Sequence, residues 1–336
     1  MKDEILSRIQ KKFPLVAKPF ETIAQELGTT EDEVLQIIKK EKSDGIIRQT
    51  SAIFDTKRLG YDSSLVAFKV APQNIENAVQ IINSHPGISH NYERDHDFNI
   101  WFTLGVPPDS KLGLQNSIEL LAKLTNADEH IALRTLKLFK INVKLNTTGK
   151  DDKKETVKKV KHKEIELTPL HHKIIQKTQY DIDIVSEPFK KITDDIGIDY
   201  DTFFSILKEL QDAGVMRRFA SILNHRKAGF NANAMVVWDI DESGAEEIGK
   251  KAAAFSAVSH CYLRPKYKNW PYNLFTMIHG KTEQETNSII EDIANEIESK
   301  SHMPLYSTRE FKKVRIEYFT PANSEWEEKF ATTEGL

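Results

Sequence analysis

Two short segments of the sequence place histidine, tyrosine and arginine at every second position. In a β-strand alternate side chains share one face, so each triplet would form a single polar face. Three polar side chains on one strand face are either a solvated surface or a functional site, and histidine, which exchanges protons near neutral pH, would suit acid–base chemistry at such a site. The triplets are His90, Tyr92 and Arg94 in SHNYER (residues 89–94), and His260, Tyr262 and Arg264 in SHCYLR (residues 259–264).

The triplets belong to an internal repeat that covers most of the chain. Residues 18–61 align with residues 187–230 at a constant offset of 169. The offset is 170 at the triplets and 174 at FNIWFT (98–103) against YNLFTM (272–277), because the second copy has an insertion that contains PKYKNWP. The lysine-rich segment 146–166 is nearly free of large apolar residues, which indicates a solvated linker between two homologous halves.

Each half has the same predicted order of elements. Apolar residues at helical spacing predict a helix–turn–helix, in which glycine ends the second helix at Gly45 and Gly214. A strand pair follows (46–54 and 64–71 in the first half), and then a strand–helix–strand–strand–helix–strand order that ends in one strand over 131–145. The fold class is therefore α+β, with two tandem repeats of a winged helix–turn–helix and a ferredoxin-like βαββαβ domain. The predicted domains are 1–60, 61–145, 167–229 and 230–322, around the linker.

Composition narrows the class of protein. With 336 residues, 39% hydrophobic and 29% charged, the chain is typical of a soluble globular protein of about two domains. A net charge of −3 gives no general attraction to nucleic acid or to membranes, and one cysteine, Cys261, excludes an intrachain disulfide and a multi-cysteine metal site. There is no apolar run of membrane-spanning length and no signal-peptide core at the N-terminus, so we expect a cytoplasmic protein.

This order of domains resembles that of the Lrp/AsnC transcription regulators. A DNA-binding recognition helix usually carries basic or amide side chains in its first turn. Here that turn is acidic in both halves, so phosphate would be repelled and we expect DNA not to be a partner. The acidic residues are Glu31, Asp32 and Glu33 in the first half and Asp199 and Asp201 in the second.

Longer motifs resemble the siroheme decarboxylases, an offshoot of that fold. The resemblance rests on SHNYERDHDFNIWFTL (89–104), NHRKAGFNANAMVVW (224–238) and SHCYLRPKYKNWPYNLFTMIHG (259–280), and covers nearly all of the chain except the linker and the tail. It implies removal of the C12 and C18 acetate carboxyls of siroheme, giving 12,18-didecarboxysiroheme for haem or haem d1 formation. It also implies no cofactor, because the iron belongs to the substrate, and a homodimer of the fused chain is expected.

The chemistry of such a substrate assigns roles to particular residues. Arginine suits a macrocycle rim that bears eight carboxylates, and histidine suits the acid that protonates the carbon from which carbon dioxide leaves. The catalytic candidates are the two triplets. His225 or His260 could instead ligate the substrate iron. The substrate-binding candidates are Arg48, Arg217, Arg218, His225, His96, Trp270, whose inserted loop could cover the pocket, and Asn273, which could also fix that loop through the backbone.

Two questions stay open from the sequence. The second half has more of the candidate site residues, since the first half has Gln49 and Thr56 at the positions of Arg218 and His225. We therefore expect catalysis in the second half, and the sequence leaves open whether the first half is also active. The alternatives to an enzyme are a DNA-binding regulator that senses haem or another tetrapyrrole, and a tetrapyrrole carrier without catalysis.

Overall fold

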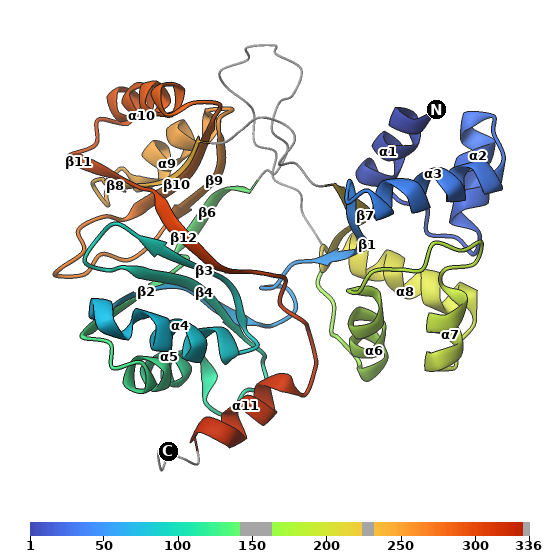
Figure 1. Ribbon diagram of the computed structural model, residues 1–336, viewed down its shortest axis with the longest axis horizontal. Helices are drawn as coiled ribbons and strands as arrows, with labels where there is room; N and C mark the ends of the chain where they lie inside the picture. Colours follow the sequence, from blue (N-terminus) through green and yellow to red (C-terminus); the bar gives the residue numbers. More distant parts are fainter. Residues whose placement is uncertain (142–162, 224–231, 332–336) are drawn as a thin grey trace. The chain divides into compact units, whose positions relative to one another are not determined.

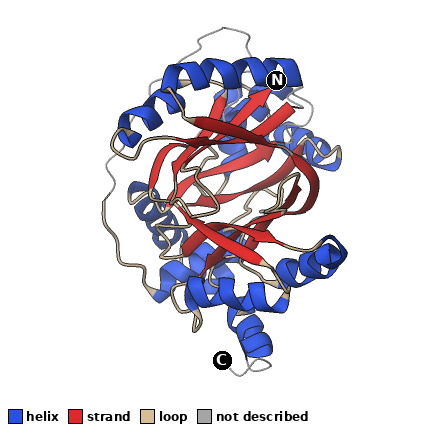
Figure 2. Ribbon diagram, turned by 90° about the vertical axis from the view of Figure 1, so that its left-hand side faces the viewer, coloured by secondary structure: helices blue, strands red, loops and turns tan. Residues whose placement is uncertain are grey.

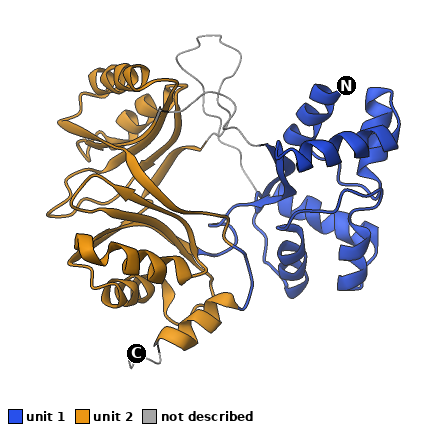
Figure 3. Cartoon of the chain, in the orientation of Figure 1, with its two compact units in different colours: residues 1–61, 160–225, 317–321 blue, residues 62–159, 226–316, 322–336 orange. Residues whose placement is uncertain are grey.

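The computed structural model describes residues 1–141, 163–223 and 232–331 (Figure 1). The chain divides into two compact units, each built from both halves of the repeat (Figure 3). Unit 1 consists of residues 1–61, 160–225 and 317–321, and unit 2 of residues 62–159, 226–316 and 322–336. The helix–turn–helix segments lie in unit 1 and the ferredoxin-like segments in unit 2, which confirms the predicted fold class.

Unit 1 holds two copies of a three-helix arrangement. In each copy a glycine ends the second helix and a polar side chain caps the start of the third. Gly28 and Gly197 end α2 and α7 with φ of 69° and 80°, a left-handed conformation that glycine adopts at little cost. Thr30 and Asp199 cap α3 and α8 by accepting backbone N–H bonds. The elements are α1 (Lys2–Lys11), α2 (Pro19–Leu27), α3 (Glu31–Ser43) and β1 (Ile47–Phe54), then α6 (Pro169–Thr178), α7 (Lys190–Ile196), α8 (Tyr200–Asp212) and β7 (Met216–Leu223).

The strands of unit 1 join the two halves. The predicted pairing of 46–54 with 64–71 is wrong, because β1 pairs antiparallel with β7 of the second half. The buried hydroxyls of Thr50 and Ser221 lie 2.6 Å apart across this pair. Phe13 of the first half packs on Phe189 and Phe219 of the second, with ring centroids 6.4 and 5.6 Å away. Burial of these rings stabilises the pairing of the halves.

Unit 2 contains two five-stranded antiparallel sheets with helices packed against their outer faces (Figure 2). Its first-half elements are β2 (Asp62–Lys69), η1 (Pro72–Asn74), α4 (Ile75–Ser84), β3 (Ile88–Arg94), β4 (Ile100–Val106), α5 (Gly113–Leu124), β5 (Glu129–Arg134) and β6 (Lys137–Ile141). Its second-half elements are β8 (Ala232–Asp239), α9 (Ala245–Ala254), β9 (Val258–Leu263), β10 (Leu274–Gly280), α10 (Glu283–Ile297), β11 (Ser301–Leu305), β12 (Ser307–Lys313) and α11 (Ala322–Ala331).

The two sheets exchange their edge strands. The strand orders are β12-β3-β4-β2-β5 and β11-β8-β10-β9-β6, so four strands of each sheet follow the ferredoxin-like order and the fifth comes from the other half. The single strand predicted over 131–145 is therefore wrong. It is interrupted at Thr135 and Leu136, where the chain passes from one sheet to the other. Residues 142–145 lie outside the described part.

Alternation along the strands gives unit 2 three apolar clusters. Val66 and Phe68 face α4 and α5 in one cluster, while Ala67 between them faces the opposite side. An equivalent cluster under α9 and α10 includes Trp238 and Cys261. The third cluster lies between the two sheets and draws on both halves, including Trp101 and Phe275. The inner faces of the sheets therefore form one shared core.

Candidate functional site

The triplets lie on equivalent strands of the two sheets of unit 2. His90, Tyr92 and Arg94 are on β3, between β4 and the exchanged strand β12. His260 and Tyr262 are on β9, between β10 and the exchanged strand β6, and Arg264 directly follows β9. Each triplet strand therefore pairs on one side with its own half and on the other side with the other half.

The triplet strands present different residues to their two faces, as alternation predicts. Cys261 lies in the cluster under α9, where its thiol is 3.6 Å from the carbonyl oxygen of Gly249 and burial raises its pKa. Asn91, at the equivalent place, donates to the Asn83 side chain of α4 at 3.0 Å. Tyr262 packs against the cluster between the sheets. The histidine–tyrosine–arginine face is thus the inner face.

Histidine and tyrosine are arranged alike in both triplets. The rings of His90 and Tyr92 have centroids 6.2 Å apart at an interplanar angle of 29°. The corresponding values for His260 and Tyr262 are 6.1 Å and 21°. All four side chains are partly exposed, so they combine a fixed geometry with access for a ligand.

The two triplet arginines are buried and link the halves. The Arg94 guanidinium donates to the backbone carbonyl of Leu305, and the Arg264 guanidinium donates to that of Leu133. Burial lowers the pKa of each arginine to about 10. Both Nε atoms are buried without a hydrogen-bond partner among the described residues.

Each arginine also lies over aromatic rings of its own half. The Arg94 guanidinium carbon is 5.8 Å from the ring centroid of Tyr92, and that of Arg264 is 4.8 Å from Tyr262. These cation–π contacts fix the tyrosines, since a cation is attracted to the face of an aromatic ring. The arginines are therefore built into the fold beneath the inner face.

The exchanged strands make the two triplets chemically different. Glu310 of β12 is the register partner of Tyr92, whereas Leu138 of β6 is the register partner of Tyr262. Burial and the charge of Glu310 raise the pKa of Tyr92 to about 12. The first triplet therefore has a carboxylate beside its tyrosine, and the second has an aliphatic side chain there.

A second difference lies behind the histidines. Ser259 is within hydrogen-bond distance of His260 Nδ1, at 2.8 Å, and of His279 Nε2, at 2.6 Å. Ser89 is 2.9 Å from His90 Nδ1, but its other contact is the hydroxyl of Thr103, at 2.6 Å. Sequence reasoning missed Ser259 and His279. The serine before each triplet was a visible signal, but no pattern in the sequence identified His279.

Trp270 and His96 meet inside unit 2 although they come from different halves. Trp270 is only 1% exposed and belongs to the cluster between the sheets, so it fills core space rather than covering an opening. The ring of His96 stands edge-on to Trp270, with centroids 5.4 Å apart, and its Nδ1 accepts from the Phe98 backbone N–H at 2.9 Å. Burial lowers the pKa of His96.

Asn273 serves the backbone. Its side-chain oxygen accepts from the Ile240 N–H at 3.0 Å and its side-chain nitrogen donates to the Ile240 carbonyl at 3.2 Å. Asn99 makes the same pair of bonds to Val70 in the first half, at 3.0 and 2.8 Å. Both amides join neighbouring segments of their own half, so their structural role is plain.

The remaining predicted residues lie in unit 1 or outside the described part. Arg48 is exposed on β1. Arg217 is exposed on β7 and pairs with Asp55 at 2.9 Å, and Arg218 beside it is partly buried. His225 lies outside the described residues. The structure thus gathers the triplets, His96, Trp270 and Asn273 in unit 2 and leaves the arginines of the helix–turn–helix segments in unit 1.

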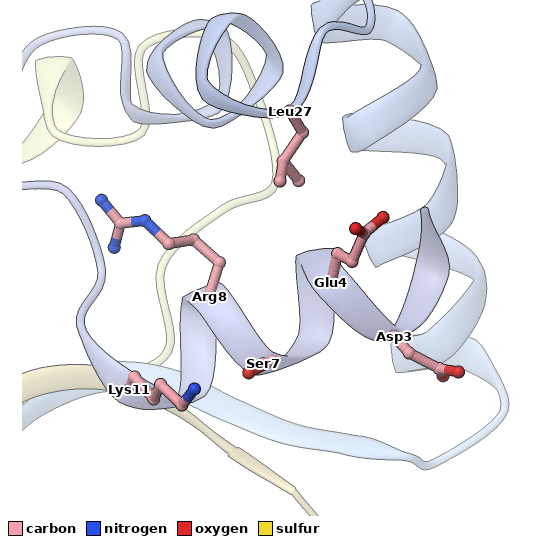
Figure 4. A pocket seen from close by; sticks show the side chains of 6 residues that line it. All are labelled: Asp3, Glu4, Ser7, Arg8, Lys11 and Leu27. Atoms are coloured by element: carbon pink, nitrogen blue, oxygen red, sulfur yellow. The ribbon is translucent and has the colours of Figure 1, made fainter.

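A surface hollow of about 400 Å³ on unit 1 shows no comparable chemistry (Figure 4). It lies beside α1 and α2, and its arginine, Arg8, is already bonded to Glu26 at 2.9 Å. In the described ranges no group of three or more His, Cys, Asp or Glu residues could hold a metal ion. None of the described helices is long and apolar enough to cross a membrane.

Family models match the chain in both halves. Residues 58–140 and 227–312 match the AsnC-like ligand binding domain, and residues 2–48 and 171–217 match the siroheme decarboxylase NirDL-like HTH domain. The four segments follow one another in the order that the repeat requires.

Individual proteins are similar over the whole chain. A siroheme decarboxylase of Hydrogenobacter thermophilus is 42% identical over 324 residues, which are 96% of each chain. The crystal structure of the siroheme decarboxylase NirDL superposes with a TM-score of 0.81 at 36% identity, covering 100% of this chain and 99% of that one. NirDL in complex with an iron-uroporphyrin III analogue gives a TM-score of 0.80 at 36% identity, with 99% of each chain covered.

Proposed function

This chain belongs to the siroheme decarboxylase family, and we propose that it removes the C12 and C18 acetate carboxyls of siroheme. The observation that carries the proposal is the similarity to a siroheme decarboxylase along 96% of both chains. A second support is that the similar protein NirDL is known in complex with an iron-uroporphyrin III analogue, a macrocycle that also contains iron. The iron in this proposal is part of the substrate.

The reaction needs a proton donor. When the bond between the acetate methylene and its carboxylate breaks, carbon dioxide leaves and the electron pair stays on the methylene carbon. A proton delivered to that carbon completes the methyl group, so one proton is consumed for each carbon dioxide released. We assign the delivery to His260 and His90, because imidazolium is an effective acid near neutral pH and both lie on the inner faces of the sheets.

The tyrosines and arginines would prepare the substrate. Tyr92 and Tyr262 stack beside the histidines and carry hydroxyls that can donate to a carboxylate. Arg94 and Arg264 hold these tyrosines by cation–π contact, and their buried positive charge attracts the anionic substrate. For Arg48, Arg217 and Arg218, carboxylate binding stays a prediction, as does iron ligation by His225 or His260.

We propose that the second triplet is the more productive. The exposed carboxylate of Glu310 beside Tyr92 would repel a substrate carboxylate, since like charges repel each other. Leu138 beside Tyr262 brings no such repulsion.

The deciding experiment is anaerobic incubation of the purified chain with siroheme, followed by mass spectrometry of the tetrapyrrole. We expect species that have lost one and then two molecules of carbon dioxide. The matched control is the chain with both His90→Ala and His260→Ala, which should still bind the tetrapyrrole, as its optical spectrum would report. Binding without any loss of mass by the unaltered chain would identify a carrier instead and refute the decarboxylase.

We also propose that the reaction needs no added cofactor and that the fused chain forms a homodimer. Decarboxylation by desalted protein with siroheme as sole addition tests the first statement. Light scattering coupled to size exclusion tests the second, with the mass of a single chain as the contrary result.

A further inference from the structure

The strongest feature outside the triplets is a hydrogen-bonded series of three polar side chains behind His260. Asn233 Oδ1 lies 2.6 Å from His279 Nδ1. His279 Nε2 lies 2.6 Å from the Ser259 hydroxyl, which lies 2.8 Å from His260 Nδ1. The four residues come from three adjacent strands, β8, β10 and β9, and Asn233 is the direct register partner of His279.

The direction of each hydrogen bond in this series, from Asn233 to His260, follows from the amide oxygen of Asn233. An amide oxygen only accepts, so His279 Nδ1 must carry the proton in the first bond. Burial lowers the pKa of His279, which favours its neutral form, and Nε2 of neutral His279 then carries a lone pair. The Ser259 hydroxyl donates to that lone pair, and its oxygen accepts from Nδ1–H of His260.

We infer that His279, acting through Ser259, is a positioning residue that holds neutral His260 with its proton on Nδ1 and its lone pair on Nε2. The catalytic consequence rests on the proposed function. When the His260 imidazolium gives its Nε2 proton to the substrate carbon, it becomes the neutral Nδ1–H form, which is the form that the hydrogen bond to Ser259 stabilises. The proton donor and the form left after donation are then matched.

The first half lacks this device. Gly105 occupies the place of His279, as the backbone shows: Gly105 N–H donates to Gly87 O at 2.9 Å and His279 N–H donates to Ala257 O at 3.1 Å. Ser89 meets the hydroxyl of Thr103 instead. A hydroxyl donates or accepts equally well, so it does not fix the direction of the bond to His90. The two triplet histidines therefore differ in the residue behind their serine, which is His279 for His260 and Thr103 for His90.

The inference is tested by nitrogen-15 NMR of the full chain labelled at histidine, at a pH where imidazole is neutral. Two-bond correlations distinguish the Nδ1–H form from the Nε2–H form, and His260→Gln identifies the signals of His260. We expect His260 to be mainly Nδ1–H. Ser259→Ala should shift the ratio of the two forms about fivefold toward Nε2–H, the factor that corresponds to one net hydrogen bond.

The control is Thr103→Val, which removes the corresponding hydroxyl of the first half and should leave the signals of His260 unchanged. Mainly Nε2–H in the unaltered chain, or the same ratio after Ser259→Ala, would overturn the inference. Asn233→Ala offers a second route to the same loss, since this exposed side chain contributes little to the core.

Turnover tests the catalytic part. His279→Phe should lower kcat about tenfold with little change in KM, because the altered group affects proton delivery and not binding. His279→Gln should restore most of the rate, because its amide oxygen can accept from Ser259. An unchanged kcat in His279→Phe would refute the catalytic consequence. Complete inactivity of the unaltered chain would refute the proposed function, while the tautomer measurement would still decide the inference.

Discussion

The guanidinium of Arg264 donates a hydrogen bond to the backbone carbonyl of Leu133, a residue of the other half of the repeat. Arg94 and Leu305 form the reciprocal bond. Each triplet thus has its arginine fixed by the sheet of the opposite half. The polar face predicted from alternate residues depends on both halves, because neither arginine finds this acceptor within its own half.

Removal of one of these arginines should destabilise the protein strongly. Arg264→Ala leaves the buried Leu133 carbonyl without its donor and removes the cation–π contact with Tyr262, so we expect a loss of about 2–4 kcal/mol in the free energy of unfolding. Urea titration followed by fluorescence measures it. Arg134→Ala is the control, because Arg134 and its partner Asp62, 3.1 Å away, are both exposed, and it should cost about 1 kcal/mol or less. Equal losses would contradict the structural role of Arg264.

The close packing of the exchanged strand β6 against α9 depends on Gly249. A Cβ at this position of α9 would lie 2.3 Å from the ring of Phe139 on β6. Gly249→Ala should therefore reduce stability by about 1–3 kcal/mol through overpacking, although alanine favours a helix by about 1 kcal/mol.

Gly244→Ala is the matched control, because its Cβ would meet only the flexible end of Ile248 at 3.2 Å. We expect it to change the free energy of unfolding by less than about 1 kcal/mol. Thermal unfolding of both variants compares them, and an equally stable Gly249→Ala would mean that β6 does not pack this closely.

Stability should fall in mild acid because of His85. This ring is buried against Trp326, with ring centroids 4.3 Å apart, and burial together with Lys312 lowers its pKa to about 3. The unfolded chain, with an ordinary histidine pKa, binds a proton below about pH 6.5 that the folded chain does not bind. The contribution of His85 is therefore complete above pH 6.5 and declines by up to about 1.4 kcal/mol per pH unit between there and pH 3.

The variant His85→Asn separates the pH dependence caused by His85 from that caused by carboxylates and by the other histidines. The asparagine oxygen can still accept from the Gly87 N–H, which bonds to His85 Nδ1 at 3.0 Å, but it does not titrate. Urea titrations at several pH values between 7 and 5 should show a shallower dependence in the variant. Identical slopes for both proteins would exclude His85 as the source.

The two triplet histidines should differ in their effect on turnover. His260→Ala should lower the rate of carbon dioxide release about 10²–10⁴-fold, as loss of a general acid does, and His90→Ala should have the smaller effect. Single-turnover mass spectrometry would resolve the two decarboxylations. His130→Gln is the control, since His130 pairs with Glu119 at the surface, and it should keep the full rate. Equal losses in the two alanine variants would place equal chemistry in both halves.

The sequence predicted the elements of each half better than their partners. The repeat, the helix–turn–helix segments and the ferredoxin-like order follow from local spacing, which a strand or helix shows wherever it lies. β1 was assigned to the wrong neighbour and β6 was not separated from β5, because a strand edge offers the same backbone groups to any partner. Only the interruption at Thr135 and Leu136 distinguishes one long strand from two, and neither residue is a turn signal.

The triplet face was predictable and its surroundings were not. Alternation correctly directed Tyr262 and Cys261 to opposite sides. The sequence did not indicate that Trp270 is buried in the core, because a tryptophan in an inserted loop can lie either on the surface or in the interior. Glu310 and His279 are far in sequence from the triplets they adjoin, so only strand pairing reveals them.

Strand exchange also sets an order of events during protein synthesis. The β3 edge of the first sheet receives its partner β12 only when residues 307–313 have been made. At the usual pace of translation, roughly 10–40 s separate the appearance of the two strands outside the ribosome. Throughout that interval the nascent first half presents an unpaired strand edge, a surface that invites association with other growing chains. Its protection therefore depends on chaperones or on the speed with which the ribosome completes β12.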